Sequence, residues 1–143
     1  MIVCEKGHEH VVRSLLEYNA NIDTNDKNGV TALMIACFNG HNHIVNILLR
    51  HNAQIDKKII EDETTPLMIA YEKTIVDETT SLMIACEKGH NHGVKSLLEH
   101  NANVGTKNKN DWTALMIVSQ IGPNHVVKSP SENNANIDAI NVA

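Results

Sequence analysis

The chain has 143 residues, a net charge of −5 and a pI near 5.9. It therefore lacks the basic balance of most proteins that bind nucleic acid or acidic membrane surfaces, and we expect neither partner. Hydrophobic residues make up 42% of the sequence and aromatic residues only 3%, which predicts a core of aliphatic and small side chains. Three cysteines, an odd number, argue against a disulfide framework. With no secretory signal and no run of about 20 apolar residues, we expect an intracellular protein, cytoplasmic or nuclear.

Internal repetition is visible from the N-terminal end onward. The pair Gly7-His8 recurs as Gly40-His41, 33 residues later, and Thr80 recurs as Thr113 at the same interval. Within residues 26–61, Thr31 predicts the N-cap of a first helix, and Gly40 predicts its end. Apolar residues at helical spacing over 41–50 predict a second helix, which Asn52 closes. Each unit is therefore expected to be a helix–turn–helix followed by a turn.

The third unit is shorter than the others. Residues 62–73 have nearly the same sequence as residues 77–88, and the two segments begin only 15 residues apart. We expect a helix over residues 65–73 and no second helix after it. That helix is expected to continue the inner row of helices and to leave a hole in the outer row. The junction at 74–78 should then be a weak point that divides the chain into two blocks and is cut first by proteases.

The last unit departs from the pattern in its second helix. Pro130 and Ser131 stand where the preceding unit has two leucines. Because an interior proline removes a helical hydrogen bond and clashes with the preceding turn, we expect this helix to be short or frayed. The equivalent leucines of the first helices, by contrast, are expected to lie along one shared spine: Leu33, Leu67, Leu82 and Leu115.

The order of these residues resembles the ankyrin-repeat family. In residues 25–56 the family pattern is matched in order by Asp26, Gly29, Thr31, Leu33, Ala36, Gly40, His41, Val45, Leu48, Leu49 and Ala53. Two departures are systematic. The family's glycine before alanine is asparagine here, and its first-helix histidine is methionine, at Met1, Met34, Met68, Met83 and Met116. The second departure should lose a polar contact near the threonine hydroxyl, although methionine can fill the space.

The resemblance implies an all-α solenoid of helix–turn–helix units joined by hairpin loops. Its units are expected at residues 1–25, 26–61, 77–107 and 108–143, with a half-unit at 62–76 that lacks its second helix.

The histidines and cysteines, which are the candidate metal-binding and catalytic residues, recur at fixed positions of the repeat. Histidine pairs such as His41 and His43 are two positions apart on a helix, so their rings point about 200° apart and cannot meet on one metal ion. The resemblance implies that the first histidine of each pair fixes the turn. Cys4, Cys37 and Cys86 share one position in the first helix and are expected to be buried, inert thiols. No phosphate-binding glycine loop is present. We expect no metal, no cofactor and no catalysis.

The resemblance implies a partner-binding surface on the concave face, formed by hairpin tips and the ends of the first helices. The positions carried over are Lys27, Asn28, Val30, Phe38, Asn39, Glu72, Lys73, Glu87, Lys88, Lys109, Asn110, Trp112, Gln120 and Ile121. Phe38 and Trp112 are the only Phe and the only Trp, and aromatic side chains are favoured as interface anchors. Trp112 has an alternative role, which is to cover the apolar edge of its own hairpin.

The sequence thus predicts a monomeric interaction module that binds an unidentified partner protein. The alternative is a fragment, or a regulatory or spacer segment of a larger ankyrin-repeat protein, without independent activity.

Overall fold

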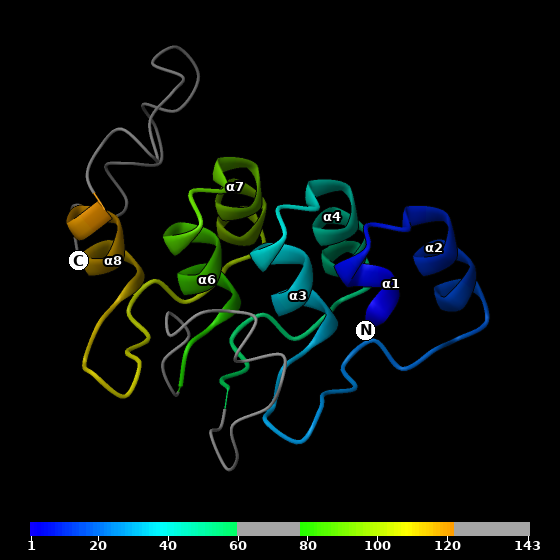
Figure 1. Ribbon diagram of the computed structural model, residues 1–143, viewed down its shortest axis with the longest axis horizontal. Coiled ribbons are helices and arrows are strands. Elements are labelled where there is room, and N and C mark those ends of the chain that lie inside the picture. Colours follow the sequence, from blue (N-terminus) through cyan, green and yellow to red (C-terminus); the bar gives the residue numbers. More distant parts are fainter. Residues whose placement is uncertain (60–77, 122–143) are drawn as a thin grey trace.

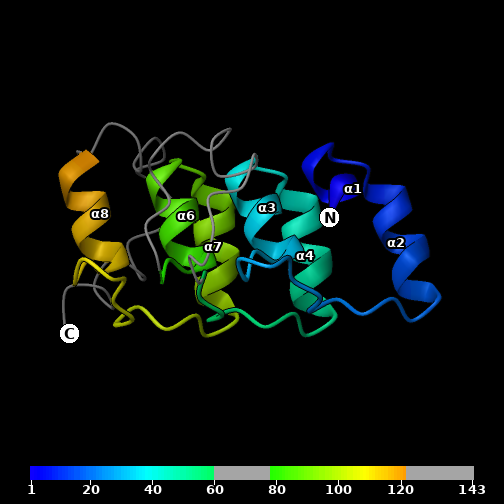
Figure 2. The ribbon, with the colours of Figure 1, turned by 60° about the horizontal axis from the view of Figure 1, so that its bottom comes forward.

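A computed structural model describes residues 1–59 and 78–121 of the chain. All regular elements in these two ranges are short α-helices, in the order α1 (Ile2–Glu5), α2 (Glu9–Glu17), α3 (Ala32–Phe38), α4 (Asn42–Arg50), α6 (Ser81–Glu87), α7 (Asn91–Glu99) and α8 (Ala114–Ile121). They stack in two rows (Figure 1 and Figure 2). The inner row is α1, α3, α6 and α8, and the outer row is α2, α4 and α7. The predicted all-α solenoid is confirmed.

The helices begin and end where the sequence predicts. The Thr31 hydroxyl caps α3 by accepting from the Met34 N–H at 3.3 Å, and the Thr80 hydroxyl accepts from Met83 N–H at 3.5 Å. Inner helices are followed by glycine in the left-handed region, as at Gly40 with φ 69°. Asparagine takes the same conformation after the outer helices, as at Asn52 with φ 61°. Both residue types tolerate positive φ, which lets the chain reverse at each helix end.

Methionine at the position of the family's histidine does more than fill space. The Met34 sulfur accepts a hydrogen bond from the Thr31 backbone N–H at 3.4 Å. Thr31 and Met34 therefore satisfy each other's backbone donors, in the manner of a capping box. The Met34 sulfur bonds the Thr31 backbone N–H and not its hydroxyl, so the expected loss of a polar contact near that hydroxyl stays a prediction.

The core is aliphatic and runs between the two rows. Leu33 and Leu82 are buried in it, as are Met34 and Met83. Leu115, at the same position in the last unit, is exposed, so the predicted shared spine is confirmed for Leu33 and Leu82 and is wrong for Leu115. Leu67 lies outside the described residues.

The stack is continuous across the shortened repeat. Helix α3 packs directly on α6, and α4 packs directly on α7. The expected insertion of a half-unit into the inner row is therefore wrong, and the expected hole in the outer row is absent. The helix predicted over 65–73 and most of the junction at 74–78 lie outside the described residues, so the unit boundaries remain a prediction.

The residues on either side of 60–77 are joined by two backbone hydrogen bonds of a hairpin. Ile59 N–H donates to the Thr79 carbonyl at 3.2 Å, and Glu78 N–H donates to the Ile59 carbonyl at 2.8 Å. The same pair of bonds closes the other hairpins, where Asp26 N–H meets the Val30 carbonyl at 3.1 Å and Gly29 N–H meets the Asp26 carbonyl at 3.0 Å. Ile59 and Glu78 thus take the two end positions of a regular hairpin tip, and residues 60–77 come between them in the sequence.

Two sequence differences separate residues 77–88, which include α6, from the similar residues 62–73. Residues 62–73 and 77–88 differ at two places only, with Pro66 and Tyr71 in the first and Ser81 and Cys86 in the second. Ser81 and Cys86 are both buried against neighbouring units. A tyrosine at the Cys86 position would overfill this site, because close-packed interiors yield little to added volume.

Candidate functional site

The candidate site is the surface formed by the ends of the inner helices and the hairpin tips, which we call the inner face. Phe38 ends α3, and Lys88 follows α6 in the next unit. The Lys88 ammonium lies over the Phe38 ring, 4.3 Å from its centroid. A cation over an aromatic face at a partly exposed site contributes about 0.5–1 kcal/mol. Two residues that the sequence placed in separate units are therefore in contact across the unit boundary.

The neighbouring side chains at the inner-helix ends differ in how they are held. Asn39 is exposed, and its amide donates to the Ile35 carbonyl of its own helix at 2.9 Å. Glu87 is half-buried beside Lys88, while Gln120 is exposed and Ile121 half-buried at the end of α8. All of these residues lie at the ends of the inner helices, and their role in binding a partner stays a prediction. Glu72 and Lys73 lie outside the described residues.

The hairpin tips are fixed by side-chain acceptors. Asp26 Oδ1 accepts from the backbone N–H groups of Asn28 and Val30, both at 2.9 Å. This closure buries Asn28 and Val30, which are 0% and 4% exposed. Their assignment to an exposed contact surface is therefore wrong, whereas Lys27 at the same tip is exposed.

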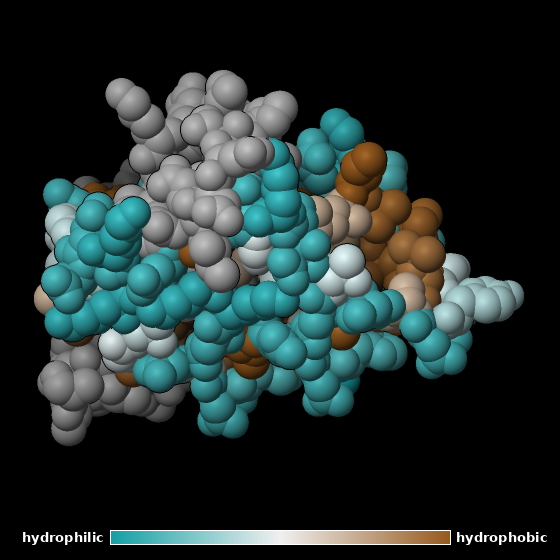
Figure 3. Space-filling model, turned by 90° about the horizontal axis from the view of Figure 1, so that it is seen from below, coloured by the Kyte–Doolittle hydropathy of each residue, from teal (hydrophilic) through white to brown (hydrophobic). Residues whose placement is uncertain are grey.

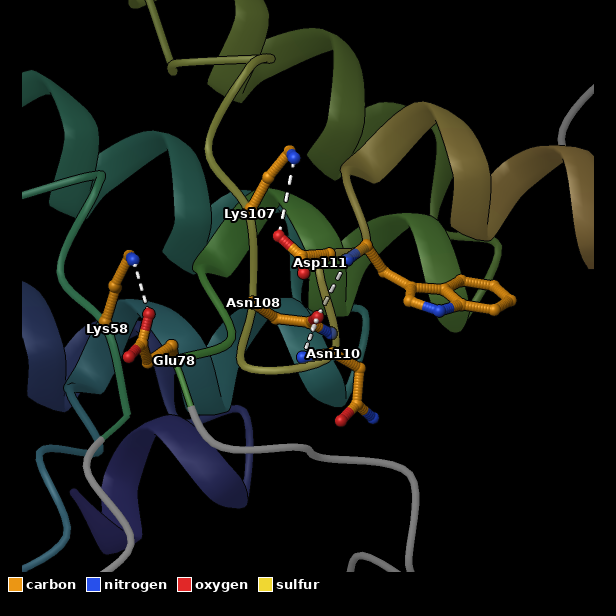
Figure 4. A network of polar contacts seen from close by, with 7 residues as sticks. Lys58, Glu78, Lys107, Asn108, Asn110 and Asp111 are labelled. Atoms are coloured by element: carbon orange, nitrogen blue, oxygen red, sulfur yellow. Dashed lines mark hydrogen bonds and ion pairs between the residues drawn. The ribbon is translucent and has the colours of Figure 1, made fainter.

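The last described hairpin repeats this arrangement. Asn108 Oδ1 accepts from the N–H groups of Asn110 and Trp112, both at 3.0 Å, and Lys107 Nζ pairs with Asp111 Oδ1 at 3.3 Å (Figure 4). Lys109 and Asn110 are exposed at the tip. Trp112 is half-buried.

The base of the insertion adds a charged pair that sequence reasoning missed. Lys58 Nζ lies 2.8 Å from Glu78 Oε2, beside the backbone bonds that join Ile59 to Glu78 (Figure 4). Glu78 has φ 64°, the left-handed conformation that Gly29 adopts in its hairpin. The missing signal was the 49-residue interval from Gly40 to Gly89, which places Ile59 and Asn108 at equivalent positions.

Two of the histidines that the structure describes, His41 and His90, join neighbouring units of the stack. His41 Nε2 lies 2.9 Å from the Glu5 carbonyl oxygen, and His90 Nε2 lies 3.0 Å from that of Phe38. Each ring therefore bonds the preceding unit, whereas the resemblance implied a role within its own turn. No group of three or more potential metal ligands gathers among residues 1–59 and 78–121.

The thiols are placed for packing and not for reactivity. Cys4, Cys37 and Cys86 are all buried and unpaired as disulfides. Burial raises the pKa of Cys86 to about 12 and raises that of Cys37 further, with the neighbouring Cys86 adding to the rise. Thiolate, the nucleophilic form, is therefore suppressed at neutral pH. The predicted burial of the three thiols is confirmed.

The comparisons with known proteins agree with this geometry. A family model for ankyrin repeats (three copies) matches residues 1–78 and, a second time, residues 62–141. None of the curated proteins compared with the chain matches it. Within the described ranges, each helix is too short or too polar to cross a bilayer.

Proposed function

Because the chain belongs to the ankyrin-repeat family, whose repeats are generally protein–protein interaction modules, we propose that its inner face binds a partner protein without catalysis. The observation that carries this proposal is the contact between Phe38 and Lys88, 4.3 Å from ring centroid to ammonium. It joins an aromatic and a charged side chain from two units into one accessible feature. Such a feature offers a partner both apolar contact and charge.

Rigidity supports the same function. The inner helices are fixed by the shared core and by the bonds that His41 and His90 make to the preceding units. The hairpin tips are fixed by Asp26 and Asn108. A surface that is already ordered loses little conformational entropy on binding, so more of its contact energy contributes to affinity.

The proposed contact residues are the accessible members of the predicted set: Lys27, Phe38, Asn39, Glu87, Lys88, Lys109, Asn110, Trp112, Gln120 and Ile121. An intracellular location, cytoplasmic or nuclear, is part of the proposal, because the three buried cysteines are free thiols.

The experiment compares partner capture from a cell lysate by the wild-type chain and by Phe38→Ala and Trp112→Ala. His92→Ala is the matched control, because His92 is exposed on the outer helix α7. We expect both aromatic variants to weaken the capture of specific partners by roughly 30-fold, as for hot-spot residues worth about 2 kcal/mol. The control should bind like the wild type. Capture that is unchanged in both aromatic variants, with unchanged circular dichroism, would contradict the proposal.

A further inference from the structure

The turn that follows α6 contacts the end of α3 through two side chains. Lys88 and His90 are two residues apart, on either side of Gly89. The Lys88 ammonium lies over the Phe38 ring, 4.3 Å from its centroid, and His90 Nε2 lies 3.0 Å from the Phe38 carbonyl oxygen. One short segment of the next unit therefore contacts both the side chain and the backbone of Phe38.

The His90 ring is held in place by its own surroundings. The His90 N–H donates to the Ala85 carbonyl at 3.0 Å, and the His90 carbonyl accepts from the Val94 N–H at 3.0 Å, so the residue is anchored to both α6 and α7. A Cβ atom on Gly40 would lie 2.6 Å from His90 Cε1, which means that the ring packs directly on the turn after α3. The ring thus fixes the end of α3 relative to α6.

The boundary between α1 and α3 has the same histidine bond without the aromatic contact. His41 Nε2 lies 2.9 Å from the Glu5 carbonyl oxygen. Asn39 has the position of Lys88, but its amide donates to the Ile35 carbonyl of its own helix at 2.9 Å. Of these two boundaries, the one between α3 and α6 combines the histidine bond with an aromatic ring and a cation.

The described surface around the hairpin tips is mostly hydrophilic. In the view from below, hydrophobic residues gather mainly at the α1–α2 end, and hydrophilic residues cover most of the rest of the described surface (Figure 3). A partner of the inner face therefore gains little from a broad apolar area. Its affinity depends on a few well-oriented side chains, and such a site relies on the residues that hold those side chains in place.

We propose that His90 is a positioning residue of the inner face, because its bond to the Phe38 carbonyl keeps the Phe38 ring beneath the Lys88 ammonium. The final carbonyls of a helix have no partner within it, so loss of this bond lets the last turn of α3 move. A cation is attracted by a ring only within about 6 Å of the centroid. A small displacement of Phe38 therefore breaks the pair. This inference rests on the proposed function of the inner face.

Nuclear magnetic resonance of the chain without a partner tests the positioning. Protons above an aromatic ring resonate upfield, so the Lys88 Cε protons should show an upfield shift that Phe38→Ala abolishes. His90→Ala should remove most of this shift, and His90→Gln, whose amide can still donate to the carbonyl, should restore part of it. His41→Ala is the matched control, because it removes the equivalent bond at the other boundary and should leave the Lys88 shift unchanged.

Two results would overturn the proposal. One is a Lys88 shift in His90→Ala that equals that of the wild type. The other is an equal loss of the shift in His90→Ala and His41→Ala, which would mean that these bonds act only on the stability of the stack. If circular dichroism shows that His90→Ala is unfolded, His90→Asn replaces it, because asparagine favours the N-cap position of α7 and its shorter side chain does not reach the carbonyl.

Partner capture separates this outcome from that of the proposed function. In the lysate experiment described above, His90→Ala should weaken capture by about two- to fivefold, the factor that corresponds to a cation–π contact at an exposed site. His41→Ala should capture like the wild type. Unchanged capture by His90→Ala together with weakened capture by Phe38→Ala would overturn the positioning role. Unchanged capture by both Phe38→Ala and Trp112→Ala would contradict the proposed function, and the Lys88 shift would still decide whether His90 positions the pair.

Discussion

The His90 ring on α7 is hydrogen-bonded to the carbonyl of Phe38 on α3, at 3.0 Å and across 52 residues of sequence. His41 makes the same bond to Glu5 at 2.9 Å across 36 residues. The extra residues between Phe38 and His90 therefore leave the inter-unit contact unchanged. The insertion between Ile59 and Glu78 lengthens the chain without separating the units on either side.

This contact predicts a strong effect at Gly40. A Cβ atom placed on Gly40 would lie 2.6 Å from His90 Cε1, and the residue has φ 69°. Gly40→Ala must therefore adopt a left-handed backbone, which costs about 1–2 kcal/mol for a non-glycine residue, and also displace the ring. We expect it to lower the free energy of unfolding by at least about 2 kcal/mol, measured by urea denaturation. Gly105→Ala is the control, because the nearest atom to its Cβ is Asn103 Oδ1 at 3.4 Å. Equal effects of the two substitutions would contradict the packing of His90 on Gly40.

The size argument at Cys86 gives a second prediction. Residues 62–73 have Tyr71 at the position of Cys86. Cys86→Tyr places that tyrosine side chain at the buried site. We expect a loss of about 1–3 kcal/mol in the free energy of unfolding, as is usual for overpacked cores. Cys86→Ser and Cys86→Ala measure the loss of the thiol without added volume and should differ from Cys86→Tyr. If Cys86→Tyr proved as stable as the wild type, volume could not be the reason that residues 77–88 form α6.

A third prediction concerns the insertion itself. Replacing residues 60–78 with the three-residue tip found at 27–29 removes the insertion and restores a hairpin of ordinary length. Because loop-closure entropy grows only with the logarithm of length, we expect a gain of about 1–2 kcal/mol in the stability of the stack. Thermal unfolding followed by circular dichroism measures it. A large loss of helix or of cooperativity in the shortened chain would mean that the stack needs the deleted residues.

Much of the fold could be predicted because its signals are local. Gly40 and Asn52 end helices through their own backbone preferences, and Thr31 caps α3 within one turn. Local signals could not show where the shortened repeat lies. Residues 62–73 have the local sequence pattern of an inner helix, but whether such a helix enters the stack depends on non-local contacts, such as those of α3 with α6.

The candidate site shows the same division between local and non-local information. The repeat pattern predicts Phe38 and Lys88 at helix ends, where the structure has them, but their contact depends on the 49-residue step between their two units. Asn28 and Val30 were placed on an exposed tip because their positions precede Thr31. The carboxylate of Asp26 draws both of their N–H groups inward, and this turn buries them.

The central claim is that the units on either side of residues 60–77 are direct neighbours, and nuclear Overhauser effects between named protons test it most directly. The His90 Cε1 proton should show a strong effect to the Gly40 Cα protons, because a Cβ atom on Gly40 would lie 2.6 Å from His90 Cε1. The His41 Cε1 proton should show the same effect to Gly7, where the corresponding distance is 2.8 Å, and this serves as the internal standard. Effects of equal strength at both sites are the predicted result. An effect at Gly7 without one at Gly40 would contradict the account.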